Sequence, residues 1–193
     1  MTKNIAKICW TVVFILFVVL DNVKSEENIG KSFAGKKMYM EVIPDRVEVV
    51  FETPEYSETQ VRVRKVKKER VVVGWIDVRV PIGNDFITQC KLLKKQGGEY
   101  RYLPYVLPSS PVCDFMKKDI YLYPDMAKHS DFPEDTSKCP MAVGNYSIYD
   151  FTINTDKIVS VATHSGEYAA EVIFNKDGNV TAIYRAYGFI NNV

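Results

Sequence analysis

The sequence has little histidine, and its few histidines form no catalytic or metal-binding motif. Only two histidines, His129 and His164, occur in 193 residues, and they lie far apart. The chain has no Gly-x-Ser-x-Gly elbow, no His-Glu-x-x-His pair, no phosphate-binding loop and no dinucleotide-binding glycine motif. We therefore expect both histidines on polar surface loops, and a protein that is not an enzyme and holds no metal or cofactor. A small hydrolase is the least favoured alternative.

An excess of charge of one sign is also missing. The chain has 25 basic and 24 acidic residues, for a formal net charge of +1. A protein that binds nucleic acid is usually more basic, so no nucleic-acid partner is expected. With 47% apolar and 25% charged residues, the composition is that of an ordinary globular protein. No internal repeat, Ser/Gly linker or composition break divides residues 26–193, which are predicted to form a single domain.

Long hydrophobic runs are absent except near the start of the sequence. Lys3 and Lys7 are followed by an apolar stretch over residues 8–20 that only Thr11 interrupts. This stretch is too short to cross a hydrocarbon core, which needs about 20 residues. Residues 1–25 are therefore predicted to be a signal peptide, cleaved near Glu26, and the protein is expected to be secreted. An uncleaved membrane anchor is the alternative.

Cysteine is scarce, and secretion would give the remaining cysteines a specific meaning. Cys90, Cys113 and Cys139 would stay in the mature chain, where an oxidising compartment favours one disulfide and leaves one cysteine over. A bond between Cys113 and Cys139 would close a loop of about 26 residues. Cys90 is expected to be a buried thiol, with a bond to a partner chain or to either other cysteine as the alternatives. The sequons that begin at Asn145 and Asn179 are predicted to be glycosylated.

Apolar residues recur with a period of two through most of the chain. They alternate with charged residues over 46–52, 61–64 and 76–80, which is typical of strands with one buried face. The other predicted strands are 36–43, 85–94, 99–107, 146–153, 158–163, 167–174 and 180–190. Gly97-Gly98 and the polar cluster 175–179 are predicted hairpin turns. The sequence therefore predicts an all-β fold, an antiparallel β-sandwich or open barrel of about eight or nine strands.

One short helix is predicted within this strand pattern, over residues 111–123. Ser110 is a favourable N-cap, and Pro111 suits the first helical position. Apolar residues then recur at spacings of three and four, and Pro124 is expected to end the helix.

Two further features leave alternatives open. The segment Arg62–Arg70 contains six basic residues: Arg62, Arg64, Lys65, Lys67, Lys68 and Arg70. They fit a patch for anionic lipid headgroups or glycans, or the charged outer face of a hairpin that prevents edge-to-edge pairing. The chain also has 12 tyrosines and 10 phenylalanines, which can fill a core or line a ligand pocket with orienting hydroxyls.

An ordered series of short motifs resembles a known family. The motifs are Gly97-Gly98-Glu99-Tyr100, Val112-Cys113-Asp114-Phe115, Phe132-Pro133, Cys139-Pro140 and Gly144-Asn145-Tyr146. Over residues 35–190 the chain resembles the secreted insect CheA/CheB-type chemosensory proteins, which are related to the ML lipid-recognition superfamily that includes the ganglioside activator protein. The resemblance implies a β-cup, in which a sandwich splays at one end around an apolar cavity. It also implies lipid binding without catalysis and a Cys113–Cys139 disulfide.

We therefore expect a secreted, noncatalytic binding protein for a lipid or lipid-like apolar ligand. The predicted helix would cover the cavity with Phe115, Met116 and Tyr123. Strand phase gives Trp75, Phe151, Tyr168, Val172 and Tyr184 as the predicted walls. The alternative is a secreted interaction module with a filled core, which acts on a receptor or glycan through its surface. Arg62–Arg70 is the candidate contact for a receptor or an anionic surface.

Overall fold

A computed structural model describes residues 40–106, 108–119, 123–152 and 165–192. Strands dominate this part of the chain, which confirms the predicted all-β sandwich. The strands are β1 (Met40–Glu52), β2 (Ser57–Val66), β3 (Glu69–Val78), β4 (Phe86–Gln96), β5 (Glu99–Val106), β6 (Ser110–Pro111), β7 (Gly144–Phe151), β8 (Gly166–Lys176) and β9 (Asn179–Asn192). The helices are α1 (Val112–Lys118), α2 (Tyr123–Lys128) and the short 3-10 helix η3 (Thr136–Lys138).

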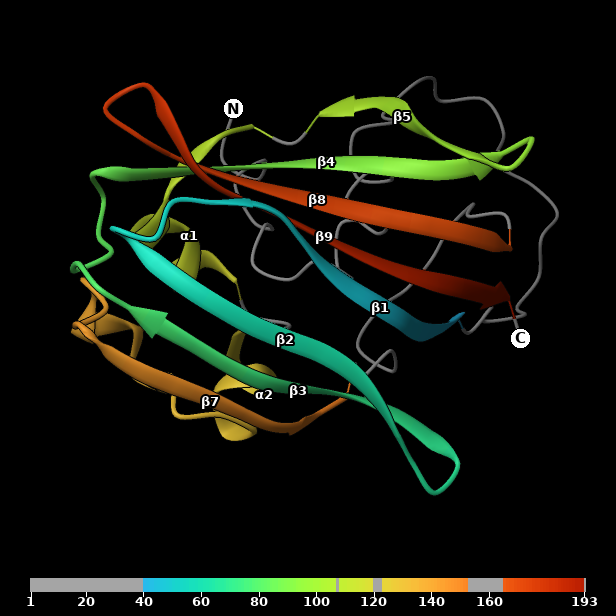
Figure 1. Ribbon diagram of the computed structural model, residues 1–193, viewed down its shortest axis with the longest axis horizontal. Coiled ribbons are helices and arrows are strands. Elements are labelled where there is room, and N and C mark those ends of the chain that lie inside the picture. Colours follow the sequence, from blue (N-terminus) through green and yellow to red (C-terminus); the bar gives the residue numbers. More distant parts are fainter. Residues whose placement is uncertain (1–39, 107, 120–122, 153–164, 193) are drawn as a thin grey trace, which may run out of the picture.

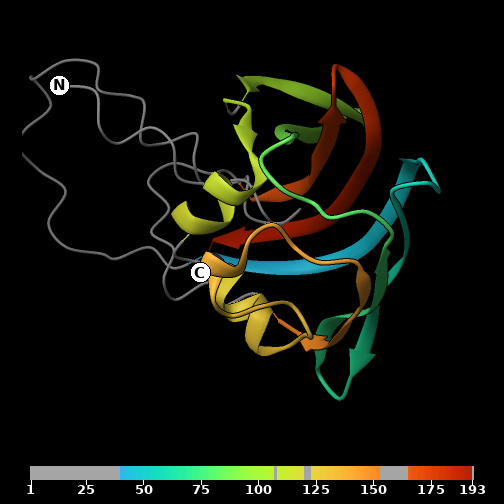
Figure 2. The ribbon, with the colours of Figure 1, turned by 90° about the vertical axis from the view of Figure 1, so that its left-hand side faces the viewer.

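The strands form two antiparallel sheets that pack as separate layers (Figures 1 and 2). The larger sheet has the order β1-β9-β8-β4-β5, with β6 paired to β4, and the smaller sheet has the order β2-β3-β7. The chain passes between the sheets from β1 to β2 and again from β3 to β4. In Figure 2, α1 and α2 both lie to the left of the two sheets.

Tight turns hold the long hairpins in register. The β4–β5 turn contains Gly97 and Gly98, with φ of 61° and 91°, and the β8–β9 turn contains Asp177 and Gly178, with φ of 51° and 81°. Glycine tolerates this left-handed conformation because it has no Cβ. Both predicted hairpin turns are thus confirmed.

The hydrophobic core lies between the facing surfaces of the two sheets. In β4, alternate residues from Phe86 to Leu92 are buried, and β3 and β7 contribute Val78, Ile148 and Phe151 from the other layer. The period-two pattern therefore has the expected physical basis, since one face of each strand is removed from water.

The predicted single helix over 111–123 is wrong in its extent. Helix α1 ends at Lys118, and α2 begins at Tyr123, so Pro124 lies in the first turn of a second helix instead of ending the first. Proline is tolerated there because the first helical N–H groups have no intrahelical acceptor. Ser110 pairs with Thr88 in the sheet and does not cap the helix.

A side chain from a distant loop caps α1 in place of Ser110. The amide oxygen of Asn84 accepts hydrogen bonds from the backbone N–H of Cys113, at 2.9 Å, and of Asp114, at 3.3 Å. Asn84 therefore fixes the start of α1 against the connection between β3 and β4.

The cysteines are paired more completely than expected. Cys113 and Cys139 form a disulfide with a Cα–Cα distance of 5.6 Å, which confirms the predicted pair. Cys90 is fully buried in β4 and is disulfide-bonded, so the expectation of a buried thiol is wrong. The predicted signal peptide, the predicted strand 158–163 and His164 lie outside the described residues.

Candidate functional site

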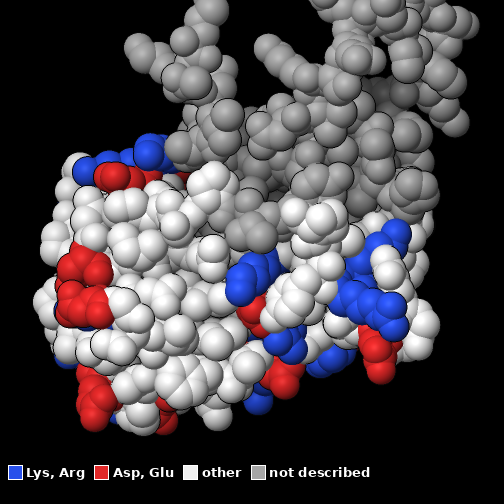
Figure 3. Space-filling view, turned by 90° about the horizontal axis from the view of Figure 1, so that it is seen from above, with Lys and Arg blue, Asp and Glu red and all other residues white. Residues whose placement is uncertain are grey.

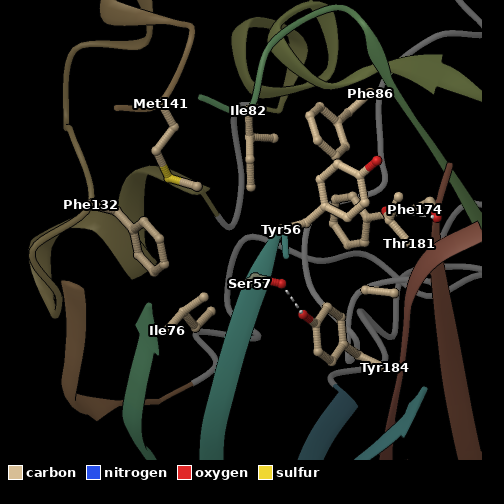
Figure 4. A pocket seen from close by; sticks show the side chains of 11 residues that line it. Tyr56, Ser57, Ile76, Ile82, Phe86, Phe132, Met141, Phe174, Thr181 and Tyr184 are labelled. Carbon is tan, nitrogen blue, oxygen red and sulfur yellow. Dashed lines mark hydrogen bonds between the residues drawn. The ribbon is translucent and has the colours of Figure 1, made fainter. Parts of the chain in front are cut away.

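A pocket lies between the two sheets, at the end where β2 and β9 begin and β3 and β8 finish (Figure 4). Its cavity volume is about 60 Å³. On the scale where a water molecule needs about 10–15 Å³, this is room for roughly four water-sized groups. The lining residues are Tyr56, Ser57, Ile76, Ile82, Phe86, Phe132, Met141, Phe174, Thr181, Ala182 and Tyr184.

The pocket wall is mostly aromatic and aliphatic. Tyr56 packs edge-on against Phe86 with ring centroids 5.8 Å apart, and Phe174 packs in the same way against Tyr184 at 6.0 Å. These pairs join residues of separate elements, so the rings hold the wall in place through tertiary contacts. A ligand in this pocket would be enclosed mainly by carbon.

Two connecting segments close one side of the pocket. The backbones of Ile82, on the β3–β4 connection, and Met141, before β7, bond to each other in both directions, at 3.0 Å and 2.9 Å. Met141 follows Cys139 by two residues, and the Cys113–Cys139 disulfide ties that segment to α1. The disulfide therefore supports one wall of the pocket as well as the helix.

A cluster of hydroxyl groups around one carboxylate forms the polar end of the pocket. Glu52 Oε1 accepts hydrogen bonds from Ser57 Oγ, at 2.8 Å, from Thr59 Oγ1, at 2.7 Å, and from the Tyr184 hydroxyl. Glu52 Oε2 accepts the backbone N–H of Thr59 at 2.9 Å. Ser57 and Tyr184 face each other in the pocket at 3.4 Å (Figure 4). We call Glu52, Ser57, Thr59 and Tyr184 the Glu52 cluster.

Burial and hydrogen bonding set the chemistry of the Tyr184 hydroxyl. Burial raises the pKa of Tyr184 well above its usual value, and the hydrogen bond to Glu52 raises it further. Tyr184 therefore stays protonated at any physiological pH and acts here as a hydrogen-bonding group.

A charged pair lies beside the aromatic part of the wall. Lys176 Nζ is 2.8 Å from Asp85 Oδ2 and 4.7 Å from the centre of the Phe86 ring. The hydrogen bond from Lys176 lowers the pKa of Asp85 below its ordinary value. Both side chains are partly in solvent, and neither lines the pocket.

A second charged pair is buried on the larger sheet. Arg185, on β9, contacts Glu171 Oε2, on β8, through two guanidinium nitrogens, and the Tyr102 hydroxyl donates to Glu171 Oε1 at 2.9 Å. Glu171 is only 4% exposed. These residues do not line the pocket, and the pair joins directly opposite positions of β8 and β9.

The predicted ligand-binding residues lie mostly in the packed core. Tyr184 lines the pocket, and Val172 is its direct cross-strand neighbour. Residues Phe115, Met116, Tyr123, Phe151 and Tyr168 are at most 3% exposed and belong to the main core cluster. Trp75 does not line the pocket. Its indole N–H donates to Gln60 Oε1, at 3.1 Å, in an exposed contact.

Most pocket residues were missed because they come from the ends of separate strands. One signal could have revealed the polar end: the inward alternation of Val63 and Val61 continues to Thr59 and Ser57. Hydroxyl side chains at inward positions of a strand need partners, which predicts a polar group nearby. The sequence does not identify Glu52 as that group, because Glu52 belongs to the preceding strand.

The six basic residues of Arg62–Arg70 lie on the β2–β3 hairpin, and all are exposed. We call this segment the basic hairpin. One of its six basic side chains, Arg70, forms an ion pair with Asp45 at 2.9 Å. The face seen from above in Figure 3 differs from the basic hairpin, since basic and acidic side chains lie next to one another on it. Elsewhere in the described part of the chain, Lys95 Nζ lies 2.7 Å from Glu167 Oε2.

Other features bear on localisation and chemistry. Asn145 and Asn179, the first residues of the two sequons, are both exposed. Among the described residues, none of the helices is long and apolar enough to cross a membrane. The same part of the chain holds no group of three or more His, Cys, Asp or Glu side chains placed to bind a metal. His129 lies after α2, with Nδ1 2.8 Å from Asp150 Oδ1.

The fold and the pocket define an antiparallel β-sandwich protein with a small apolar cavity between its sheets. Residues 88–170 match a family model described as "Protein of unknown function (DUF1091)". The match runs from β4 into β8 and includes both cysteines of the Cys113–Cys139 disulfide. It is consistent with the ML-like resemblance of the sequence. No curated protein matches the chain.

Proposed function

We propose that this protein is a noncatalytic carrier that binds a small apolar ligand in the pocket between its sheets. The observation that carries the proposal is the pocket itself, with a carbon-rich wall and a polar end at the Glu52 cluster. Binding pockets of this kind combine mostly apolar lining with a few polar groups that orient the ligand. The ML-like resemblance supports the same function, because that superfamily recognises lipids.

The proposal extends to secretion and to a chemosensory role. The Cys113–Cys139 disulfide fits an oxidising compartment, where such bonds persist. The resemblance to insect CheA/CheB-type proteins suggests a lipid-like semiochemical as the ligand. Protein recovered from the medium of expressing insect cells should have its N-terminus near Glu26. Retention in the cells with residues 1–25 intact would contradict secretion.

Native mass spectrometry of the purified protein tests the carrier function. Wild-type protein should retain a co-purified apolar molecule, or take up an added one, with a single-site mass increase. Ala182→Leu should abolish this increase, since Ala182 is 4% exposed and lines the pocket. Ala142→Leu is the matched control, because Ala142 is exposed on the connection before β7. Equal uptake by both variants would place the ligand elsewhere and refute the proposal.

The basic hairpin supports a second candidate function, that of a surface interaction module. Six exposed basic side chains on an edge hairpin form a surface that attracts anionic glycans. Arg62→Glu with Arg64→Glu should abolish retention on a heparin column. Lys91→Glu with Lys94→Glu, on the larger sheet, makes the same charge change and should retain most of it. Equal losses would show that net charge alone causes retention, which would refute this second function.

A further inference from the structure

The arrangement of protons in the Glu52 cluster restricts what the pocket can bind. A carboxylate only accepts hydrogen bonds, and each hydroxyl has one proton and two acceptor sites. Ser57, Thr59 and Tyr184 all lie within hydrogen-bond distance of Glu52 Oε1. The contacts of Tyr184 with Thr59 and Ser57, at 3.1 Å and 3.4 Å, can redistribute these protons but add none. The cluster therefore has acceptor sites to spare, while its protons are already used within it.

The other hydroxyls of the pocket wall supply no free proton at the polar end. The Thr181 hydroxyl donates to the backbone carbonyl of Phe174 at 3.2 Å. In Figure 4 the Tyr56 oxygen points toward Phe86, away from the facing oxygens of Ser57 and Tyr184. A ligand that reaches the polar end thus meets oxygen lone pairs, with a carboxylate directly behind them.

We infer that the pocket selects a neutral ligand with an O–H or N–H donor at its polar end, such as a primary alcohol. This inference rests on the proposed function and specifies the class of ligand. An alcohol can donate its proton to Ser57 Oγ or to the Tyr184 oxygen while its carbon chain lies against the aromatic wall. An ether of equal size offers no proton, and a carboxylate adds a negative charge next to Glu52. Both should bind more weakly, since a buried acceptor without a donor is unfavourable.

Three small molecules of matched size test the inference in ligand-observed NMR titrations. The probes are 1-butanol, its isomer methyl propyl ether, and butanoate. Wild-type protein should bind 1-butanol about fivefold more tightly than the ether, as expected for one net hydrogen bond. Butanoate should bind more weakly than both.

Two substitutions at the cluster should remove this selectivity. Tyr184→Phe deletes one acceptor and should reduce the preference for 1-butanol without weakening the ether. Glu52→Gln supplies two new amide protons, so the hydroxyls can donate into the pocket and the ether and butanoate should gain affinity. Tyr187→Phe is the matched control, because the Tyr187 hydroxyl donates to Glu48, at 2.7 Å, on the same strand pair but does not line the pocket. Its selectivity should equal that of the wild type.

The outcomes separate this inference from the proposed function. Equal affinities for 1-butanol and the ether, or tighter binding of butanoate, would overturn the inference if Ala182→Leu abolishes all three. The pocket would then bind ligands without selecting a donor. Binding that Ala182→Leu does not affect, or no binding at all, would refute the pocket itself and the inference with it. An unchanged preference in both Tyr184→Phe and Glu52→Gln would show that the Glu52 cluster does not set it.

Discussion

Removing the Cys113–Cys139 disulfide should strongly destabilise the fold. The bond joins residues 26 apart in sequence. Closing a loop of this length lowers the entropy of the unfolded chain by about 12 cal/mol/K, which corresponds to about 3.5 kcal/mol at 25 °C. We therefore expect Cys113→Ala with Cys139→Ala to lower the free energy of unfolding by about 3.5 kcal/mol. For a protein of this size, the melting temperature should fall by roughly 7–14 °C.

Urea unfolding, followed by circular dichroism, measures this change directly. The double variant should unfold at lower urea with a slightly larger m-value, since an uncrosslinked chain exposes more surface when unfolded. Either single variant breaks the same crosslink, so its loss of stability should agree with that of the double variant within about 1 kcal/mol. A loss below about 1 kcal/mol in the double variant would refute the loop-entropy argument. A large spread among the three variants would show that packing around the cysteines sets the loss.

Three further predictions concern the surface and the charged pairs. Enzymatic removal of N-glycans should lower the mass of protein from insect cells, and Asn145→Gln and Asn179→Gln should each remove one glycan; no shift would contradict glycosylation. Glu171→Gln should lower the free energy of unfolding by about 3 kcal/mol, because it leaves a partly buried guanidinium without its counter-charge; a loss below about 1 kcal/mol in urea unfolding would contradict this. The hydrogen bond from Lys176 lowers the pKa of Asp85 in the folded protein, so ionised Asp85 stabilises the fold. This stabilisation is complete above the pKa of Asp85 in the unfolded chain, about 3.9, and is lost as the pH falls through the lower pKa of the folded state. Asp85→Asn should therefore make stability less sensitive to pH below about 4, as thermal unfolding across pH would show, and an identical acid limb would contradict the assignment.

The strands could be predicted because their signal is local. In β2, the alternation of Val61 and Val63 with Arg62 and Arg64 records which face meets water, and the structure confirms that alternation. The helix boundaries depend on distant contacts. Asn84, 29 residues before Cys113, caps α1, and no periodicity within residues 111–123 contains that information.

The pocket could be predicted only in part for the same reason. The alternation of side chains along a strand predicts that Val172 and Tyr184 point toward the interior, and the structure agrees. Phase does not say how far along a strand the sheets separate. That depends on the register between β8 and β9 and on connections such as the one carrying Ile82, which a single sequence does not specify.

The size of the pocket makes the length of the ligand decisive. Four buried CH₂ groups contribute about 3 kcal/mol, at roughly 0.8 kcal/mol each, whereas micromolar binding needs about 8 kcal/mol. A cavity of about 60 Å³ therefore cannot hold an alkyl chain at micromolar strength unless the sheets part and expose deeper core residues such as Val172 and Phe151. In a series of primary alcohols, affinity should rise about fourfold per CH₂ beyond four carbons if the sheets part. Phe151→Trp, which enlarges a side chain in the deeper core, should then restore a plateau at four carbons. A wild-type plateau at that length would show that the pocket stays closed and that the protein carries a small volatile molecule instead of a lipid.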